Sequence, residues 1–451
     1  MLIIILALLS RLLFLDIRPL HHDEGVNYFF ADNILEGRGF KYDPLNYHGP
    51  SYFFILFLSF FLLGVNEFSL RLPAALFGII LVLVPLFVIN KNYNKYVLAT
   101  FLLVSPSLMF YSRYSIHEML FVLASFLAIY SLTSLIENKN LDNLPLFAFS
   151  LGILVTTKET TIILLFIMAV ICAVNYKEIK KINFGDRDRI ILSVLLFILI
   201  YVVLFTSFFT NMPGLKDSVG GYLPWTERGV TEPGHQKSFL YYFWILVQYE
   251  LPLVLLALVG TIFAYKNRHN IFVKNMAIWF VLIFLIYSLI GYKTPWLIVN
   301  ISVPMIMMAS IGVKSIYNKR IMLAIFRLSV IYLVFFSLYL NFVHTWEKDN
   351  YFAYVHTDSD VLNLVKETNL NYGPREKILI VSDTYWPLPF YFDNKKVEYL
   401  DKIDNVTFDK NYDYYIVKKE IFVNSTLPNG YKYREYKLRD DVPLDLVYKI
   451  E

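Results

Sequence analysis

The sequence predicts an α-helical polytopic membrane protein with about eleven transmembrane helices and a small C-terminal α/β domain outside the membrane. Three observations lead to this fold class. Of the 451 residues, 57% are hydrophobic and only 17% are charged, whereas about a quarter of the residues of a soluble domain are charged. The apolar residues form long blocks instead of alternating with polar ones. After about residue 343 the chain becomes polar.

The apolar blocks define the candidate spans. They cover approximately 2–15, 50–64, 72–90, 96–111, 119–136, 144–157, 161–176, 190–209, 239–265, 271–291, 296–313 and 321–343. A spanning helix needs about 20 residues, so several blocks are short. We interpret block 2–15 as the first span, with Met1 cytoplasmic. A signal peptide is the alternative, but the block lacks a charged beginning and a small-residue cleavage site before Asp23.

Basic residues in short loops indicate which blocks cross the membrane, because such loops usually face the cytoplasm. Four loops contain them: Lys91 and Lys95; Lys177, Lys180, Lys181, Arg187 and Arg189; Lys266, Arg268 and Lys274; and Lys314, Lys319 and Arg320. All four share one side with Met1 only if block 50–64 is an embedded or juxtamembrane helix on the outer side. Eleven spans then form a transmembrane domain, 1–343, whose first outer loop is 16–71.

Residues 344–451 are predicted to form a soluble extracytoplasmic domain of about 100 residues. The runs Lys377–Asp383 and Tyr412–Lys418 are rich in strand-forming residues, and a helical stretch, Ser359–Thr368, precedes the first of them. Two glycosylation sequons, at 405–407 and 424–426, support an outside location.

Several classes of protein are disfavoured by composition. The net charge of +4 reflects loop lysines, and no interleaving of basic and aromatic residues points to nucleic acid. The single cysteine, Cys172, lies in an apolar run, so no intrachain disulfide is possible. The absence of an inverted repeat disfavours a secondary transporter.

The first outer loop contains His21-His22-Asp23-Glu24 directly after a span. One interpretation is a solvated loop with a helix N-cap at Asp23. A second is a metal site, although adjacent side chains rarely converge on one ion. A third is a carboxylate that acts as a general base on an acceptor hydroxyl.

Other ionisable residues lie at the ends of apolar blocks. His48 begins the embedded helix, where it is a cap, a packed ring or a catalytic group. Arg113 and Glu118 flank the turn between two spans, with His117 beside them, and either anchor the interface or line a cavity. The pair Lys158–Glu159 interrupts two short blocks, as a hairpin turn or as a cavity-lining pair.

Lys293 is either an interfacial anchor or another cation of the same group. The residues predicted to share the outer side are Asp23, Glu24, His48, Arg113, His117, Glu118, Lys158, Glu159 and Lys293. Such a set suits a lipid phosphate. The cations would neutralise charge on a phosphate leaving group, and a carboxylate would deprotonate an incoming hydroxyl.

These motifs make the chain resemble the GT-C superfamily of polytopic glycosyltransferases, in particular the branch of protein O-mannosyltransferases and bacterial aminoarabinose–lipid A transferases. The resemblance rests on Asp23–Glu24, Tyr47–Pro50, Leu70–Ala75, Arg113 with Glu118, and Lys158 after Thr157. The chain looks most like an archaeal subgroup described as flippase-activity-associated. That likeness rests on Asp23–Asn27, Tyr292–Trp296 and Trp386–Tyr391.

The resemblance implies a sugar donor linked to polyprenyl or dolichyl phosphate and an acceptor hydroxyl on a glycan, lipid or protein. The reaction would invert the anomeric carbon at the outer face of the cell membrane, among membrane lipids. Asp23 would be the catalytic base with Glu24 beside it, and Arg113, Lys158 and Lys293 would bind the donor phosphate. The supporting residues would be His22, His48, His117, Glu118 and Glu159.

The resemblance favours no metal cofactor, although oligosaccharyltransferases in the wider superfamily use a divalent metal. Protein O-mannosyltransferases have a His-Pro-Pro element where this chain has His48-Gly49-Pro50, and the large module of the eukaryotic enzymes is missing. Both departures put a protein acceptor in doubt. The alternative function is a non-catalytic protein of the same fold that binds a lipid carrier or assists its flipping. A third is a structural subunit of a glycan-assembly complex.

Overall fold

The structure is a computed structural model of the whole chain. It describes all residues except 46–47, 90–93, 232–234, 372–376, 394–395, 402–407, 409–411, 424–426, 428 and 450–451. Contacts divide the chain into two compact units. We call 1–15 with 33–344 the membrane unit, and 16–32 with 345–451 the C-terminal unit.

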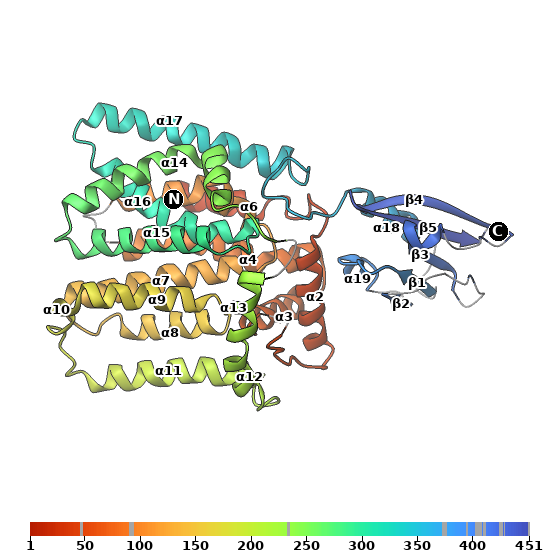
Figure 1. The fold of residues 1–451 in the computed structure, drawn as a ribbon, viewed down its shortest axis with the longest axis horizontal. Coiled ribbons are helices and arrows are strands. Elements are labelled where there is room, and N and C mark those ends of the chain that lie inside the picture. The colour runs from red at the N-terminus through yellow and green to blue at the C-terminus, as the bar shows by residue number, and fades with distance from the viewer. Residues whose placement is uncertain are drawn as a thin grey trace. The chain divides into compact units, whose positions relative to one another are not determined.

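The membrane unit is a helical bundle (Figure 1). Its helices are α1 (Leu2–Leu12), α3 (Ser51–Leu63), α4 (Glu67–Val88), α5 (Lys95–Val104), α6 (Pro106–Tyr111), α7 (Glu118–Asn138), α8 (Leu144–Val155), α9 (Thr161–Val174), α10 (Tyr176–Ile179), α11 (Arg187–Phe205), α12 (Gly214–Gly220), α13 (Tyr222–Thr231), α14 (Tyr241–Lys266), α15 (Ile271–Leu289), η1 (Pro295–Leu297), α16 (Ile298–Lys314), α17 (Lys319–Leu338) and η2 (Tyr339–Val343).

Seven helices of the described chain are long and apolar enough to cross a membrane. They are α4, α7, α11, α14, α15, α16 with η1, and α17 with η2. Five further apolar helices, α1, α3, α5, α8 and α9, are shorter. The protein is therefore a multi-pass membrane protein, while the count of eleven spans stays a prediction.

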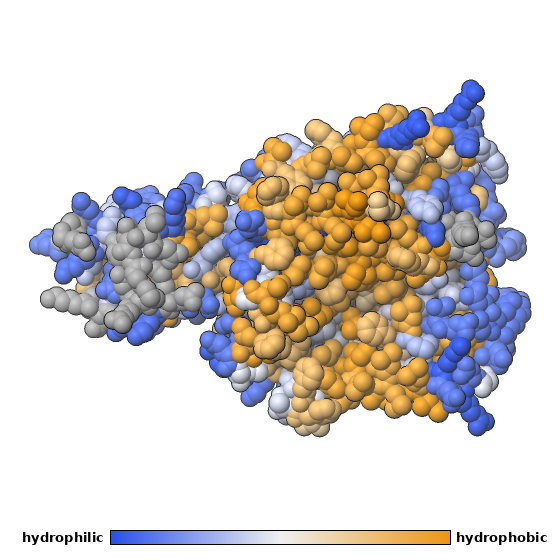
Figure 2. Space-filling model, turned by 180° about the vertical axis from the view of Figure 1, so that it is seen from behind, coloured by the Kyte–Doolittle hydropathy of each residue, from blue (hydrophilic) through white to orange (hydrophobic). Residues whose placement is uncertain are grey.

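The bundle has central and peripheral helices. In their most apolar stretches, 94% of the residues of α16 with η1 and 89% of those of α7 are buried, against 11% in α11 and 17% in α17 with η2. A helix that is apolar on exposed faces as well is suited to lipid. Figure 2 shows the result on the face in view, where hydrophobic residues cover the middle of the membrane unit and hydrophilic residues gather at its end.

Basic loops lie together at one end of the bundle. The connections α9–α11, α14–α15 and α16–α17 are all at that end (Figure 1). Lys91, from the first of the four predicted loops, is outside the described residues. Helix α3, of 13 residues, begins where Ser51 Oγ donates to the Thr156 carbonyl at 2.9 Å, in the α8–α9 turn at the opposite end. Because α4 begins at that end as well, α3 does not run the length of the bundle (Figure 1).

Buried arginines satisfy backbone carbonyls where short helices end. Arg11 donates to the carbonyls of Leu102 (3.1 Å) and Leu103 (2.9 Å) near the end of α5. Arg71, which is fully buried, donates to a carbonyl that follows α1. A carbonyl in an apolar interior has no water to bind, so these guanidinium groups stabilise helix ends that would otherwise be costly.

Two of the predicted continuous blocks are interrupted. Block 96–111 breaks into α5 and α6 at Ser105, because Pro106 has no backbone N–H to continue the helix. Helix α14 is kinked at Glu250 (φ −131°, ψ 26°), two residues before Pro252. Glu250 is fully buried and accepts hydrogen bonds from Ser105 Oγ (2.7 Å) and Ser107 Oγ (2.8 Å), which joins the two interruptions.

The C-terminal unit contains a five-stranded mixed sheet. Its elements are α18 (Asp360–Asn371), β1 (Lys377–Val381), α19 (Leu388–Tyr391), β2 (Lys396–Leu400), β3 (Tyr414–Lys418), α20 (Lys419–Phe422), β4 (Tyr431–Arg439) and β5 (Val442–Lys449). The strand order is β2-β1-β3-β5-β4. The first two pairings are parallel, and β5 is antiparallel to both β3 and β4.

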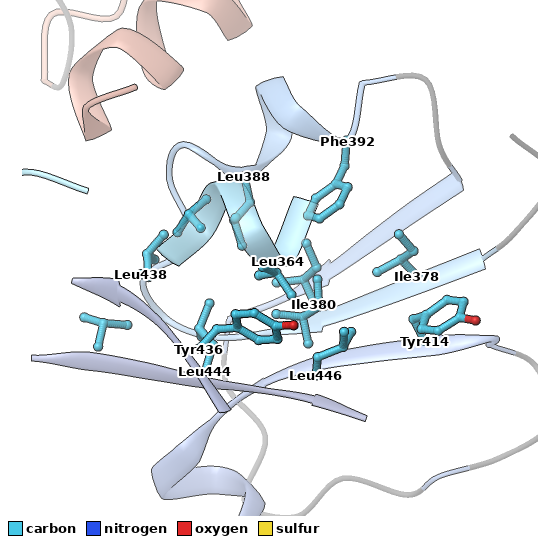
Figure 3. Packing of buried hydrophobic residues seen from close by; sticks show 13 residues of the cluster. Leu364, Ile378, Ile380, Leu388, Phe392, Tyr414, Tyr436, Leu438, Leu444 and Leu446 are labelled. Carbon is cyan, nitrogen blue, oxygen red and sulfur yellow. The ribbon is translucent and has the colours of Figure 1, made fainter. Parts of the chain in front are cut away.

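One face of the sheet carries the main core of this unit. Val361 and Leu364 of α18, with Leu388 of α19, pack against alternate residues of the strands (Figure 3). The alternation follows from the two-residue period of a strand. The predicted runs at 377–383 and 412–418 are confirmed as β1 and β3, and the helical stretch 359–368 as α18. Both sequons include positions outside the described residues.

The division into compact units differs from the predicted domain boundary at one place. Residues 16–32, predicted to belong to the transmembrane domain, pack with the C-terminal unit. They include the start of α2 (His22–Leu35), which continues into the membrane unit. Sequence patterns could not reveal this, because the contacts join segments more than 300 residues apart, such as Leu20 N–H and the Tyr391 hydroxyl with a separation of 371.

Close packing of α14 on α16 gives a stability prediction. A Cβ at Gly260 would lie 2.0 Å from the Met308 carbonyl oxygen, whereas one at Gly220 in α12 would meet nothing within 4 Å. Small residues let membrane helices approach this closely. We expect Gly260→Ala to destabilise the protein by about 1–3 kcal/mol, seen as a lower Tm in detergent. Gly220→Ala is the control, and equal Tm values for the two variants would contradict the prediction.

Candidate active site

The turn between α8 and α9 carries a buried ion pair. Lys158 Nζ contacts a carboxylate oxygen of Glu118, the first residue of α7. The two residues are only 4% and 2% exposed. Losing one partner would leave a buried charge uncompensated, which commonly costs about 3–5 kcal/mol. The turn is therefore tied to the start of α7 by charge.

Glu159, the next residue, is held by two side chains from the segment before α3. The Tyr42 hydroxyl donates to Glu159 Oε1 at 2.7 Å, and His48 Nδ1 lies 2.9 Å from Oε2. Burial raises the pKa of Glu159 to about 7, although the Tyr42 hydrogen bond favours the charged form. This carboxyl therefore changes charge near neutral pH.

Two neutral histidines lie beside these carboxylates. The ring centroids of His48 and His117 are 5.2 Å apart, and His48 stacks on Trp225 of α13 at 4.5 Å. Burial lowers the pKa of each histidine well below its usual value. His117 Nε2 is buried and has no hydrogen-bond partner in the part of the chain that the structure describes. The Arg228 guanidinium lies over the Trp225 ring, 4.8 Å from its centroid.

Gly49 allows the His48 segment to reach the turn. Its N–H donates to the Thr157 carbonyl at 3.1 Å, and Ser51 N–H donates to Thr156 at 3.0 Å. A Cβ at position 49 would be 2.3 Å from the Thr156 carbonyl oxygen, so the approach requires glycine. A proline would also remove the N–H donor. These two contacts explain why position 49 is glycine in this chain and not the proline of a His-Pro-Pro element.

Two of the predicted phosphate ligands are engaged elsewhere in the membrane unit. The Arg113 guanidinium donates to carbonyls after α1, at 2.7 Å for Leu13 and 2.6 Å for Phe14. Lys293 Nζ contacts the Ile290 carbonyl beside an isolated bridge between Gln236 and Tyr292. Burial lowers the pKa of Lys293. Their predicted roles at the donor phosphate stay predictions.

The predicted base lies in the C-terminal unit, in the first turn of α2. Asp23 is half-buried, whereas Glu24 is fully buried and accepts a hydrogen bond from the His21 N–H at 3.0 Å. His22 Nδ1 accepts from Arg439 Nη2 at 3.2 Å. Burial, assisted by Arg439, lowers the pKa of His22 to about 4. The two carboxylates therefore differ in burial, and Glu24 accepts a hydrogen bond at the helix start.

The described residues do not support the alternative of a metal site. No group of three or more His, Cys, Asp or Glu side chains there could hold a metal ion. Four residues of these surroundings were not predicted from the sequence: Tyr42, Trp225, Arg228 and Arg439. Tyrosine and tryptophan are common throughout the chain, which has 34 and 6 of them, so their positions carried no distinguishing signal.

One segment of the chain matches a family model, and the chain as a whole matches solved structures in fold. Residues 47–208 match the family model described as dolichyl-phosphate-mannose–protein mannosyltransferase. This segment contains Glu118, Lys158 and Glu159, and excludes Asp23 and Lys293. The chain as a whole has the GT-C fold.

The fold is similar to that of ArnT. The crystal structure of ArnT from Cupriavidus metallidurans bound to undecaprenyl phosphate has a TM-score of 0.69 and 14% identity, over 99% of this chain and 97% of that one. The crystal structure of the same protein in the apo state has a TM-score of 0.67 and 13% identity, over the same shares of the two chains. No curated protein sequence matches the chain. The resemblance to the GT-C superfamily is thus confirmed, while the likeness to the archaeal subgroup stays a prediction.

The raised pKa of Glu159 predicts a pH dependence of stability. Because the folded protein binds this proton more tightly than the unfolded chain, stability falls as pH rises from about 4.5 to about 7. The slope from one such group is at most about 1.4 kcal/mol per pH unit. We expect Glu159→Gln to flatten the dependence of Tm on pH over this window. An unchanged slope in that variant would show that Glu159 is not the group responsible.

Proposed function

We propose that the protein is a glycosyltransferase that moves a sugar from a polyprenyl-phosphate or dolichyl-phosphate donor to an acceptor hydroxyl. The match of residues 47–208 to a mannosyltransferase family model supports the class of reaction. The ArnT fold supports a polyprenyl phosphate carrier, since that protein binds undecaprenyl phosphate. The acceptor hydroxyl belongs to a glycan, a lipid or a protein.

The observation that carries the proposal is the buried cation in the α8–α9 turn. Lys158 is 4% exposed and is balanced by Glu118, with a second carboxyl of raised pKa beside it. A cation kept at the end of a membrane bundle marks a functional path more often than a structural one. We assign Lys158 to the donor phosphate, which would compete with Glu118 for the ammonium group. His117 Nε2 is a further polar group for the donor.

Asp23 is assigned as the base because it is the less buried of the two adjacent acids. Glu24 is fully buried and already accepts the His21 N–H, whereas Asp23 is half-buried. A general base must reach the proton that it removes, and a fully buried carboxylate is less suited to this. Glu24 therefore shapes the turn that presents Asp23.

The reaction balances with these residues alone. Asp23 takes the proton of the acceptor hydroxyl as its oxygen attacks the anomeric carbon from the face opposite the phosphate. The bond between that carbon and the phosphate oxygen breaks, and the lipid phosphate leaves with the electron pair. Lys158 neutralises the negative charge that develops on the leaving phosphate. Attack from the opposite face inverts the anomeric centre.

The proposed orientation places the Lys158 turn and the C-terminal unit outside the cytoplasm. It is supported by the gathering of the basic loops at the other end of the bundle (Figure 1), because short basic loops are usually cytoplasmic.

Single cysteines test this orientation in a Cys172→Ala background. Lys180 and Asp383 are both exposed, one in a basic loop and one in the C-terminal unit. We expect a membrane-impermeant maleimide to label Asp383→Cys in intact cells and Lys180→Cys only after permeabilisation. The reverse pattern would contradict the orientation.

Separate variants test the two assigned roles. Asp23→Asn should lower kcat about 10²- to 10⁴-fold without weakening the binding of polyprenyl phosphate in nanodiscs. Lys158→Met should weaken that binding. Asp16→Asn, an exposed acid in the same loop, is the control for the first variant.

Full transfer by Asp23→Asn would remove Asp23 as the base. A different outcome would favour the lipid-carrier or flippase-associated alternative. In that outcome, wild-type protein transfers no sugar from any donor, and Asp23→Asn abolishes lipid transport.

A further inference from the structure

The turn that carries Asp23 is bound on both sides by residues from the end of the chain. Leu20 N–H donates to the Tyr391 hydroxyl at 2.8 Å. The His21 ring bridges two segments, because its Nε2 lies 2.8 Å from the Tyr354 carbonyl and its Nδ1 accepts from Asp23 N–H at 3.0 Å. A carbonyl only accepts, so Nε2 carries the proton and Nδ1 is the acceptor. The ring thus links the Asp23 backbone to the C-terminal segment.

Arg439, the last residue of β4, makes a second link. Its Nη2 donates to His22 Nδ1 at 3.2 Å and to the Trp386 carbonyl at 2.9 Å. Arg439 is only 7% exposed, and the lowered pKa of His22 keeps that ring a neutral acceptor. One guanidinium therefore fixes the residue before Asp23 to the segment 386–391.

Packing leaves this turn little freedom to shift. A Cβ at Gly25 would lie 2.8 Å from both Cα and Cβ of Pro387, so the helix backbone sits directly on the proline. One turn further along α2, the Tyr28 ring packs edge-on against Phe390 at 5.1 Å, and its hydroxyl binds Asp393. The motif Trp386–Tyr391 is thereby explained as the surface on which the start of α2 rests.

We propose that Arg439 and Tyr391 are positioning residues for Asp23, and that the C-terminal unit is the part of the enzyme that holds the base in place. The proposal rests on the proposed function, in which Asp23 removes the acceptor proton. It gives the C-terminal unit a task in the chemical step, separate from binding the donor phosphate, which is assigned to Lys158 of the membrane unit.

A base that is held less firmly affects turnover more than binding. Misplacing a catalytic group by about 1 Å can cost about 10²-fold in rate. Donor binding depends on residues of the membrane unit, so its KM should not change with the position of Asp23. The separation of kcat from KM therefore distinguishes a positioning role from a general loss of structure.

The test compares full-length variants in nanodiscs. Arg439→Ala removes the link to His22, and Tyr391→Phe removes only the hydroxyl that accepts from Leu20. Arg434→Ala is the matched control, because Arg434 is on the same strand, is 61% exposed and pairs with Glu367 at 2.9 Å. We expect Arg439→Ala to lower kcat about 10²-fold with the donor KM nearly unchanged. Tyr391→Phe should lower kcat less, and Arg434→Ala should leave it unchanged.

Hydrogen exchange of the backbone amides of residues 20–25 supplies a readout that does not need activity. We expect faster exchange there in Arg439→Ala and Tyr391→Phe, and wild-type exchange in Arg434→Ala. In an Asp23→Asn background, Arg439→Ala should cause no further loss of kcat, because both changes act through the same group.

The outcomes separate the two proposals. Wild-type kcat in Arg439→Ala and Tyr391→Phe would overturn the positioning role, as would unchanged exchange at 20–25. If Arg439→Ala unfolds, the kcat and exchange of Tyr391→Phe decide. Full activity of Asp23→Asn would instead overturn the base assignment. The exchange data would still report whether the C-terminal unit holds the turn.

Discussion

Backbone groups at helix ends inside an apolar bundle must find partners, and the membrane unit depends on how this is done. Carbonyls at the ends of α1 and α5 receive hydrogen bonds from Arg11, Arg71 and Arg113. Because these arginines supply donors that water would otherwise provide, helices too short for a full crossing end within the bundle. Arg113 binds carbonyls that follow α1, and the turn after Arg113 leads to Glu118. The same hydrogen bonds therefore help to position Glu118 for its ion pair with Lys158.

That ion pair and its surroundings show how a charged site is kept in an apolar protein. Lys158 is balanced by Glu118, and Glu159 is held by Tyr42 and His48. The neutral forms of the histidines and the raised pKa of Glu159 limit the number of buried charges. A site of this kind accepts an anion more readily than one filled with fixed carboxylates, since one proton can compensate for an added charge.

Sequence patterns predicted the elements far better than the contacts between distant segments. The apolar blocks, the turn at 158–159 and the strands β1 and β3 follow from local periodicity and charge. The grouping of His48 with Glu159 followed only from counting loop charges, which put both on one side. The packing of 16–32 on the C-terminal unit has no local signal, because Arg439 is one of many charged residues in a polar region. For Arg113, the sequence predicted a place at the end of a span. It did not predict that the guanidinium would bind four backbone carbonyls.

The hydrogen bond between Leu20 and Tyr391 also implies that the start of α2 packs late during synthesis. The start of α2 leaves the ribosome long before its partners, and the two are 371 residues apart. Loops of such length close late, because their entropy must be overcome before the contact is gained. The residues around Gly25 therefore lack their packing partners until the last membrane helix is inserted and the sheet has folded. A chain halted after residue 343 would carry the membrane helices but would lack the residues on which the Asp23 turn packs.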